Sequence, residues 1–271
     1  MGAVKWSRLY FRGVSDLHSR CDGDSVTKSQ VNRLGEELRQ PGPPDDETLA
    51  RLQGFRAAYD APMAKAQAVV QQSLGVPATA RLKTVNTIIE KLRRARTRLA
   101  EMQDIAGLRI VRDMELREQD ALVQQLAGVF PGAKVVDRRS RPSHGYRAVH
   151  VIVTVDGHLV EIQVRTYIQD LWAQAMERLA DEVGREVRYG RVPEAAAARV
   201  AQLQSATAEV ASIEDEYRRL RVLEPELVSP NRMLTGAREV ALRHGTAERL
   251  RATLTARSSR VCDFLRGMLV G

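Results

Sequence analysis

The segment PSHGYRAVHVIVTVDGHLVEIQVRTY, residues 142–167, decides the fold of this 271-residue chain. Two runs rich in β-branched residues flank an Asp-Gly pair at 156–157. Such a pair between two apolar runs is a strong signal for a two-residue hairpin turn. With the turn placed there, His150 lies opposite Gln163 on the neighbouring strand. The segment therefore predicts a β-hairpin whose register is set by its turn.

Side chains alternate between the two faces of a strand, so this hairpin has one apolar and one polar face. The apolar face carries Val149, Val151, Val153, Val160, Ile162 and Val164. The opposite face gathers an aromatic ring, an imidazole, a carboxylate, an amide and a guanidinium, from Tyr146, His150, Glu161, Gln163 and Arg165. The polar face is interpreted either as the floor of an active site or as an ordinary sheet surface in contact with water.

Strand-like and helix-like patterns alternate ahead of this hairpin. The expected strands are short and lie at residues 79–83, 108–112 and 134–137. Amphipathic helices are expected after the first two strands and again after the hairpin, because apolar residues recur there at helical spacing. This order predicts an α+β fold, with a mixed β-sheet of about five strands and helices packed on one face.

Helical segments flank the alternating core on both sides. The expected helices cover residues 25–39, 45–75 with a break at Pro62, 194–223, 234–244 and 246–269. The helix over 194–223 carries apolar residues seven apart, which indicates a helix–helix seam, within the chain or between chains. We therefore expect three parts: an N-terminal helical extension (1–76), a core (77–190) and a C-terminal helical extension (191–271).

The composition is typical of a globular protein, with 44% apolar and 28% charged residues. No apolar run approaches the roughly 20 residues of a membrane-spanning helix. The first residues lack the apolar core of a signal peptide. Two cysteines are too few for a disulfide scaffold or an all-cysteine zinc site. We therefore expect a cytoplasmic protein that does not bind membranes.

Basic residues dominate the formal charge, which is +8 at pH 7 and favours anionic partners such as nucleotides or nucleic acid. The sequence contains no P-loop, no GxGxxG, no HExxH and no GxSxG motif. A cationic cluster instead occupies residues 81–113. Arg81 and Lys83 lie two apart on an expected strand, and Lys91 lies on the following helix. Such a cluster can hold a polyphosphate without a P-loop.

Transfer of a phosphoryl-type group also requires a hard cation, which one or two carboxylates hold together with the substrate phosphates. Asp104 and Glu161 are the candidate ligands. Each is next to basic residues, at the end of an expected element or on the polar face of the hairpin. Surface ion pairs are the alternative interpretation for both.

Five short motifs stand in order within residues 79–190. They are Arg81-x-Lys83, Lys91, Asp104-Ile-Ala-Gly-Leu-Arg109-Ile, His144-Gly-Tyr146-Arg-Ala-Val-His150 and Glu161-Ile-Gln163-Val-Arg165-Thr. In this order and spacing they resemble the synthetase domain of the RelA/SpoT alarmone synthetase family. The resemblance implies a nucleotidyltransferase-like synthetase fold of the short, single-domain type. It also favours the active-site interpretation of the hairpin.

The resemblance implies an activity and a donor site. Family members transfer the β,γ-pyrophosphate of ATP to the 3′-hydroxyl of an acceptor nucleotide, with Mg²⁺. Carried over to this chain, Arg81 and Arg109 would stack on the adenine. Lys83 and Lys91 would hold the ATP phosphates, and Asp104 would bind Mg²⁺.

The resemblance implies an acceptor site on the polar face of the hairpin. Tyr146 would stack on the acceptor base. Glu161 would help to hold the metal or would activate the 3′-hydroxyl. The acceptor and phosphate site would be completed by His150, Gln163 and Arg165. His144 stands where many members have Asn, which leaves the contacts to the acceptor open.

Three acceptor hypotheses remain at this point. With GDP or GTP as acceptor, the product is a (p)ppGpp-type alarmone of the stringent response. With the 3′-terminal adenosine of tRNA as acceptor, the protein is a toxin that blocks translation, and an antitoxin becomes a possible partner. A non-catalytic nucleotide-binding or RNA-binding module is the third. Self-association through the helix over 194–223 is compatible with each of them.

Overall fold

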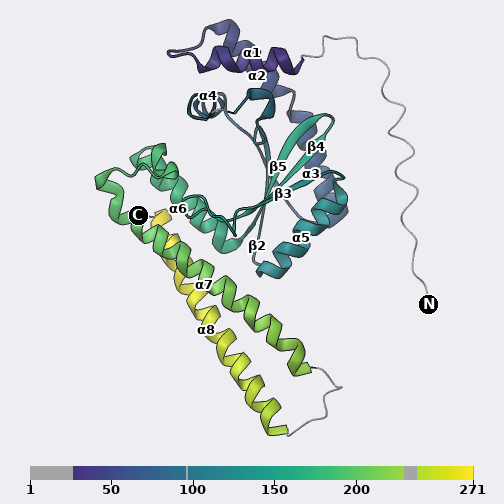
Figure 1. The fold of residues 1–271 in the computed structure, drawn as a ribbon, viewed down its shortest axis with the longest axis vertical. Coiled ribbons are helices and arrows are strands. Elements are labelled where there is room, and N and C mark those ends of the chain that lie inside the picture. The colour runs from purple at the N-terminus through teal and green to yellow at the C-terminus, as the bar shows by residue number, and fades with distance from the viewer. Residues whose placement is uncertain (1–26, 96, 229–236, 271) are drawn as a thin grey trace, which may run out of the picture.

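Five strands form one mixed sheet in the computed structural model, which describes residues 27–95, 97–228 and 237–270, with side chains outside 221–244. The strands are β1 (Thr79–Leu82), β2 (Ala106–Arg112), β3 (Lys134–Asp137), β4 (Val149–Val155) and β5 (His158–Thr166). Their order is β1-β2-β5-β4-β3, with β2 and β5 parallel and the other neighbours antiparallel (Figure 1). The predicted α+β class and five-stranded mixed sheet are confirmed.

Strands β4 and β5 form the hairpin that the sequence predicts. His150 pairs with Gln163, so the register is the predicted one. The two turn residues, Asp156 and Gly157, have φ angles of 48° and 78°. Both central residues of a type I′ turn need a positive φ, which Gly adopts without strain and Asp tolerates. The turn chemistry therefore explains the register.

The apolar face of the hairpin lies at the centre of the larger hydrophobic core. Val151, Ile162 and Val164 are fully buried there. Full burial of each such side chain contributes about 1.5–3 kcal/mol to folding. The helices of this core are α1 (Lys28–Arg39), α2 (Asp46–Ala57), α3 (Asp60–Leu74), α4 (Val85–Arg94) and α5 (Leu116–Val129). Of these, α3 and α5 form the predicted helical layer on one face of the sheet (Figure 1).

The predicted break at Pro62 is wrong by a few residues, because the chain interrupts its helix at residues 58–59. Pro62 instead lies in the first turn of α3. The first backbone N–H groups of a helix have no intrahelical acceptor, so proline is tolerated there. The predicted end of this helix at Gly75 is confirmed, with a left-handed φ of 64°. The predicted start of the first helix at residue 25 lies outside the described residues.

A second hydrophobic cluster joins three helices beyond the hairpin. These are α6 (Tyr167–Val183), α7 (Ala197–Val228) and α8 (Ala237–Val270), with short 3₁₀ turns at Leu99–Glu101, Arg185–Tyr189 and Glu194–Ala196 elsewhere in the chain. The apolar seam of α7, including Leu203 and Val210, packs within the chain against α6 and α8. Intramolecular packing of the seam is thereby confirmed.

The helices α7 and α8 run side by side as a long hairpin that projects from the body of the molecule (Figure 1). The helix α8 continues through Gly245, where two shorter helices are predicted. Glycine lowers helix stability by about 1 kcal/mol relative to alanine, which the packing of α8 on α6 and α7 offsets. Among the described residues, no helix has the length and apolarity needed to cross a membrane. The three-part division of the chain stays a prediction.

Candidate active site

The sheet register brings the predicted site residues into two rows on one face of the sheet, with a single row of the opposite face between them. In one row Arg81, Gly107 and Glu161 lie side by side on β1, β2 and β5. In the other row Arg109, on β2, lies beside Gln163, on β5, which in turn pairs with His150. Residues in alternate rows share a face. The pairing of β2 with β5 therefore joins the cationic strands to the polar face of the hairpin.

These rows form the floor of a cleft of about 540 Å³. Its lining includes most of the residues that the sequence singles out: Arg81, Lys83, Lys91, Asp104, Arg109, Glu161, Gln163 and Arg165. Gly107 also lines the cleft and has no side chain to fill the space between Arg81 and Glu161. The cleft is therefore a basic-walled space that also carries the carboxylates of Glu90, Asp104, Glu161 and Glu177.

Asp104 is clamped by two ammonium groups. Lys83 Nζ donates to Oδ2 at 2.8 Å and Lys91 Nζ donates to Oδ1 at 2.7 Å. Burial raises the pKa of the Asp104 carboxyl, but the charges and hydrogen bonds of the two lysines outweigh it, so its pKa lies below its ordinary value. Asp104 is therefore an anion, and it holds both lysines at the cleft wall.

A directional hydrogen-bond chain crosses the hairpin. Arg165 Nη2 donates to Tyr146 Oη at 3.1 Å, and Tyr146 Oη lies 2.9 Å from His150 Nε2. His150 Nδ1 lies 3.0 Å from Glu161 Oε1. A carboxylate accepts only, so Nδ1 carries a proton, and in the neutral imidazole Nε2 then accepts from the tyrosine hydroxyl. Gln163 bridges the ends, since it accepts from Arg165 at 2.8 Å and donates to Glu161 at 2.7 Å.

The hydrogen bonds of this network decide the charge of Glu161. The side chain is buried, which raises its carboxyl pKa, but hydrogen bonds from His150 and Gln163 lower the pKa below its ordinary value of 4.5. The net shift of Tyr146 is the opposite one: burial outweighs the other effects and raises the pKa of its phenol. The site therefore pairs an ionised carboxylate with a neutral tyrosine.

Asp170, in the first turn of α6, is a site residue that sequence reasoning missed. Its Oδ1 accepts from Arg165 Nη1 at 2.7 Å and lies 3.8 Å from Arg109 Nη1. One carboxylate thus links the arginines of two different strands. The signal was available, because Thr166 and Gln169 form a capping box that fixes the start of α6 at the end of β5.

A smaller cavity of about 200 Å³ opens beside the cleft. Tyr146 lines this smaller cavity and not the larger cleft, and His150 lies behind both Tyr146 and Glu161. The other residues that line the smaller cavity are Ser143, His144, Trp172, Ala173, Met176, Glu177, Arg188 and Tyr189. Glu177, Arg188 and Tyr189 line both spaces, so the two cavities adjoin.

The 3₁₀ turn at Arg185–Tyr189 supplies a wall of the cleft that sequence reasoning did not identify. The guanidinium of Arg94 lies 3.5 Å from the centre of the Tyr189 ring, which ties this turn to α4. Within the described chain, Arg165 Nε and Arg188 Nε are buried donors without an acceptor. Both side chains line the cleft. The positive charge of these two guanidiniums at the cleft suits an anionic ligand.

Two carboxylates of the cleft, those of Asp104 and Glu161, fit a hard divalent cation. The two are close enough for the negative charge of Asp104 to raise the pKa of the Glu161 carboxyl. Mg²⁺ commonly uses one or two carboxylates and takes its other ligands from phosphates and water. No group of three or more His, Cys, Asp or Glu side chains suited to a metal occurs in the part of the chain described. Such an ion would therefore depend on the phosphates of a substrate.

Comparisons with known proteins agree with this geometry. The family described as "Region found in RelA / SpoT proteins" matches residues 80–180. An uncharacterized protein of Mycobacterium tuberculosis is 35% identical over 258 residues, which cover 90% of this chain and 89% of the relative. GTP pyrophosphokinase YjbM of Bacillus subtilis is 33% identical over 159 residues, which cover 53% of this chain and 70% of the relative.

Among solved structures, the small alarmone synthetase 1 from Bacillus subtilis is 26% identical to this chain, with a TM-score of 0.47. The likeness covers 67% of this chain and 100% of that chain. The family match over residues 80–180 spans most of the residues that line the cleft. The chain is therefore a member of the RelA/SpoT alarmone synthetase family.

Proposed function

We propose that this protein transfers the β,γ-pyrophosphate of ATP to the 3′-hydroxyl of GDP or GTP. The observation that carries the proposal is the basic-walled cleft, which presents Asp104 and Glu161 among its basic residues and adjoins an aromatic cavity. A pyrophosphotransferase activity agrees with family membership and with the relative named GTP pyrophosphokinase. The acceptor, the metal and the residue roles are proposals.

The reaction joins the acceptor O3′ to the β-phosphorus of ATP. The bond between that phosphorus and the oxygen bridging it to the α-phosphate breaks, and AMP leaves. The hydroxyl proton passes to Glu161, which is ionised and needs only to lie within hydrogen-bond reach of the hydroxyl. Correct placement of the two substrates supplies much of the remaining rate enhancement.

The donor site is assigned to the wall formed by β1, β2 and α4. Arg81 and Arg109 lie on the same face of adjacent strands, two residue pairs apart, and their planar guanidiniums suit stacking on adenine. Lys83 and Lys91 would exchange Asp104 for the ATP phosphates. The released carboxylate of Asp104 would then hold Mg²⁺ together with Glu161. The metal neutralises phosphate charge when it is bound.

The acceptor base is assigned to the smaller cavity, where the rings of Tyr146 and Trp172 offer apolar contact. Glu177 favours guanine over adenine there. Its half-buried side chain lines both cavities and forms no hydrogen bond or ion pair with another described residue. A carboxylate accepts hydrogen bonds from the adjacent N1–H and 2-amino groups of guanine, and adenine has no such pair of donors.

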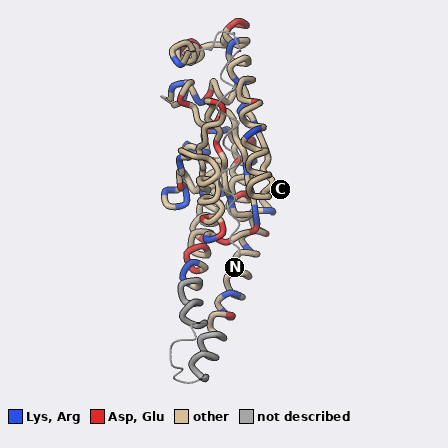
Figure 2. Tube along the Cα trace, turned by 90° about the vertical axis from the view of Figure 1, so that its right-hand side faces the viewer, with Lys and Arg blue, Asp and Glu red and all other residues tan. Residues whose placement is uncertain are grey.

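A tRNA acceptor is the second candidate, favoured by the net charge of +8. Its weakness lies in the helical hairpin, where acidic and basic residues are interspersed (Figure 2). Arg257 pairs with Glu209 and Glu216, and Arg218 pairs with Asp215. Arginines neutralised in this way contribute less to binding of a phosphate backbone.

One assay tests the function and its acceptor together. The protein is incubated with Mg²⁺, γ-labelled ATP and, in parallel, GDP, GTP, ATP or bulk tRNA. Label on GDP or GTP is the expected result, and label on tRNA alone would overturn the choice of acceptor. Catalysis itself is rejected if neither the wild type nor a Glu161→Gln control transfers label to any acceptor.

The assignment of Tyr146 has its own test. Tyr146→Ala is expected to lose acceptor use while ATP binding changes little, because the residue lines only the smaller cavity. Tyr146→Phe is the matched control, since it keeps the ring and removes only the hydroxyl. A large loss of ATP affinity in the alanine variant contradicts the assignment.

A further inference from the structure

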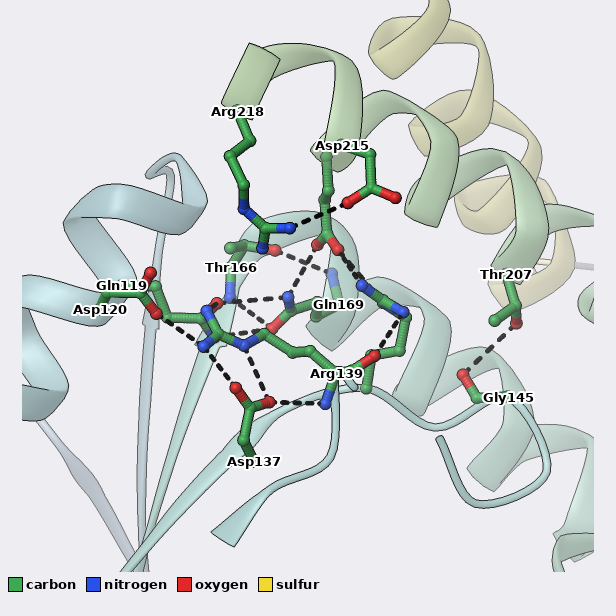
Figure 3. A network of polar contacts seen from close by, with 12 residues as sticks. Gln119, Asp120, Asp137, Arg139, Gly145, Thr166, Gln169, Thr207, Asp215 and Arg218 are labelled. Atoms are coloured by element: carbon green, nitrogen blue, oxygen red, sulfur yellow. Dashed lines mark hydrogen bonds and ion pairs between the residues drawn. The ribbon is translucent and has the colours of Figure 1, made fainter. Parts of the chain in front are cut away.

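The loop that carries Tyr146 is fastened at both ends by arginines. Arg139 donates to Asp137, Asp120 and Gln119, which fixes the start of the loop on β3 and α5 (Figure 3). Arg147, directly after Tyr146, donates through Nη1 to the Arg139 carbonyl at 2.8 Å. The segment between residues 139 and 147 is thereby closed into a compact loop.

The outer fastening of this loop comes from α7. Glu214 Oε2 accepts from Arg147 Nη2 at 2.5 Å and from Nε at 3.2 Å. Its other oxygen accepts from Gln169 Nε2 at 2.8 Å. Only 7% of Glu214 is exposed, so both carboxylate oxygens are satisfied inside the protein. A buried charge pair of this kind fixes geometry strongly, because neither partner can turn to water.

A second contact with α7 lies one residue before Tyr146. Gly145 has a φ of 93°, and a Cβ at this position would lie 2.7 Å from Trp172 Cζ2 and 2.8 Å from Thr207 Oγ1. The Thr207 hydroxyl lies 3.4 Å from the Gly145 carbonyl oxygen (Figure 3). Trp172 is itself held by α7, since its Nε1 donates to the Leu203 carbonyl at 2.9 Å.

We propose that Glu214 of α7 is a positioning residue for the acceptor site, which acts by holding Arg147 and through it the ring of Tyr146. Both neighbours of Tyr146 in the chain contact α7 or α6, so the ring direction depends on the helical hairpin. The inference rests on the proposed function, because it concerns the acceptor half of that site. Glu214 lies outside the segment that the RelA/SpoT family matches.

The donor half of the cleft gives an internal reference. Lys83, Lys91 and Asp104 lie next to β1, in α4 and just before β2, and their mutual contacts involve no residue of α7. A change at Glu214 should therefore alter acceptor use and leave ATP use intact. A general loss of stability would alter both.

The test uses the full chain and five variants, Glu214→Gln, Arg147→Gln, their combination, Glu214→Asp and Asp215→Asn. Asp215 is the matched control, because it is the next residue of α7 but forms an exposed pair with Arg218 (Figure 3). We expect Glu214→Gln to raise the KM for GDP about tenfold, with the KM for ATP within about twofold. The double variant should have the same KM for GDP as Arg147→Gln, because both substitutions remove the same contact, between residues 147 and 214.

Hydrogen exchange of the amides in residues 138–147 gives a readout that does not depend on activity. Exchange there should quicken in Glu214→Gln and stay as in the wild type in Asp215→Asn. Glu214→Asp, which keeps the charge, should recover part of the GDP affinity. Unchanged exchange, additive losses in the double variant, or equal rises in both KM values would each overturn the proposal. If wild-type protein uses neither GDP nor GTP, the proposed function fails, and the exchange data still decide whether Glu214 orders the loop.

Discussion

Nδ1 of His150 lies 3.0 Å from Oε1 of Glu161, so the imidazole donates to the carboxylate across the β4–β5 hairpin. This hydrogen bond keeps the carboxylate charged in a buried position. The other ring nitrogen, Nε2, lies 2.9 Å from the hydroxyl of Tyr146. The same imidazole therefore orients both the candidate base and the ring of the acceptor site.

Removal of this imidazole should shift the pH dependence of activity. The folded-state pKa of Glu161 lies below 4.5, so in the wild type the base stays ionised until the pH falls below that value. In His150→Leu the opposing effect of burial prevails, and the carboxyl pKa rises. The acid limb of kcat/KM should therefore move to higher pH. His158→Asn, at the turn end of β5, is the control and should leave the limb in place.

Asp104→Asn should separate donor binding from catalysis. The substitution frees the ammoniums of Lys83 and Lys91, so binding of metal-free ATP should be retained or strengthened. The turnover number should fall by about 100-fold or more, because a ligand for the charge-neutralising cation is lost. Calorimetric titration of ATP with and without Mg²⁺ measures the first effect. Weaker binding of metal-free ATP would contradict the assignment.

Gly107→Val should block the cleft without harming the fold. A Cβ at this position meets only backbone oxygens at 3.6 Å and 3.8 Å, which are ordinary contacts. Valine also favours strands. The added methyl groups would occupy the space between Arg81 and Glu161, and ATP affinity should fall at least tenfold, about 1.4 kcal/mol. Thr154→Val, at an exposed position of β4, is the control, and thermal unfolding of both variants should match the wild type.

Glu177→Gln should relax the choice of acceptor. If Glu177 accepts from the 2-amino group of guanine, wild-type protein should prefer GDP over inosine diphosphate, which lacks that group. The preference should be about tenfold or more, and it should shrink in the variant, since a paired contact to a base is worth about 1–3 kcal/mol. Competition between the two acceptors measures it directly. Equal use of both by the wild type would remove Glu177 from the site.

Gly145→Ala should destabilise the protein more than Gly132→Ala. Both glycines have a positive φ, of 93° and 78°, so each substitution carries a backbone strain of about 1–2 kcal/mol. Only Gly145 adds a steric conflict, with Trp172 and Thr207, whereas a Cβ at Gly132 meets nothing within 4 Å. Overpacking adds about 1–3 kcal/mol. Denaturant unfolding should show this difference, and similar losses would show that the loop yields easily.

The hairpin and its register could be read from the sequence because local chemistry determines both. The Asp-Gly turn fixes which residues face each other, and the alternation of valines with polar residues fixes which face is buried. Lys91 could be placed near Lys83 for a similar reason, since a short helix follows the strand directly. These residues are brought together by short connections.

The rest of the site depends on long-range packing that local patterns do not contain. Glu177 and Glu214 lie on helices whose polar residues look alike in sequence, whether they face water or a cavity. Which of them turn inward depends on how α6 and α7 pack, and therefore on apolar contacts far along the chain. Arg188 and Tyr189 belong to a 3₁₀ turn that follows Gly184, whose φ of 104° redirects the chain. That direction cannot be inferred from periodicity.

The contact between Arg147 and Glu214 has a consequence for protein engineering. The arginine belongs to the family segment, whereas the carboxylate that neutralises it belongs to the C-terminal hairpin. A graft of residues 80–180 alone into another scaffold would lack α7, so Arg147 would lose both its counter-charge and the contact that anchors the loop. Chimeras that move the synthetase segment should therefore carry α7 with it, or replace residues 147 and 214 as a pair.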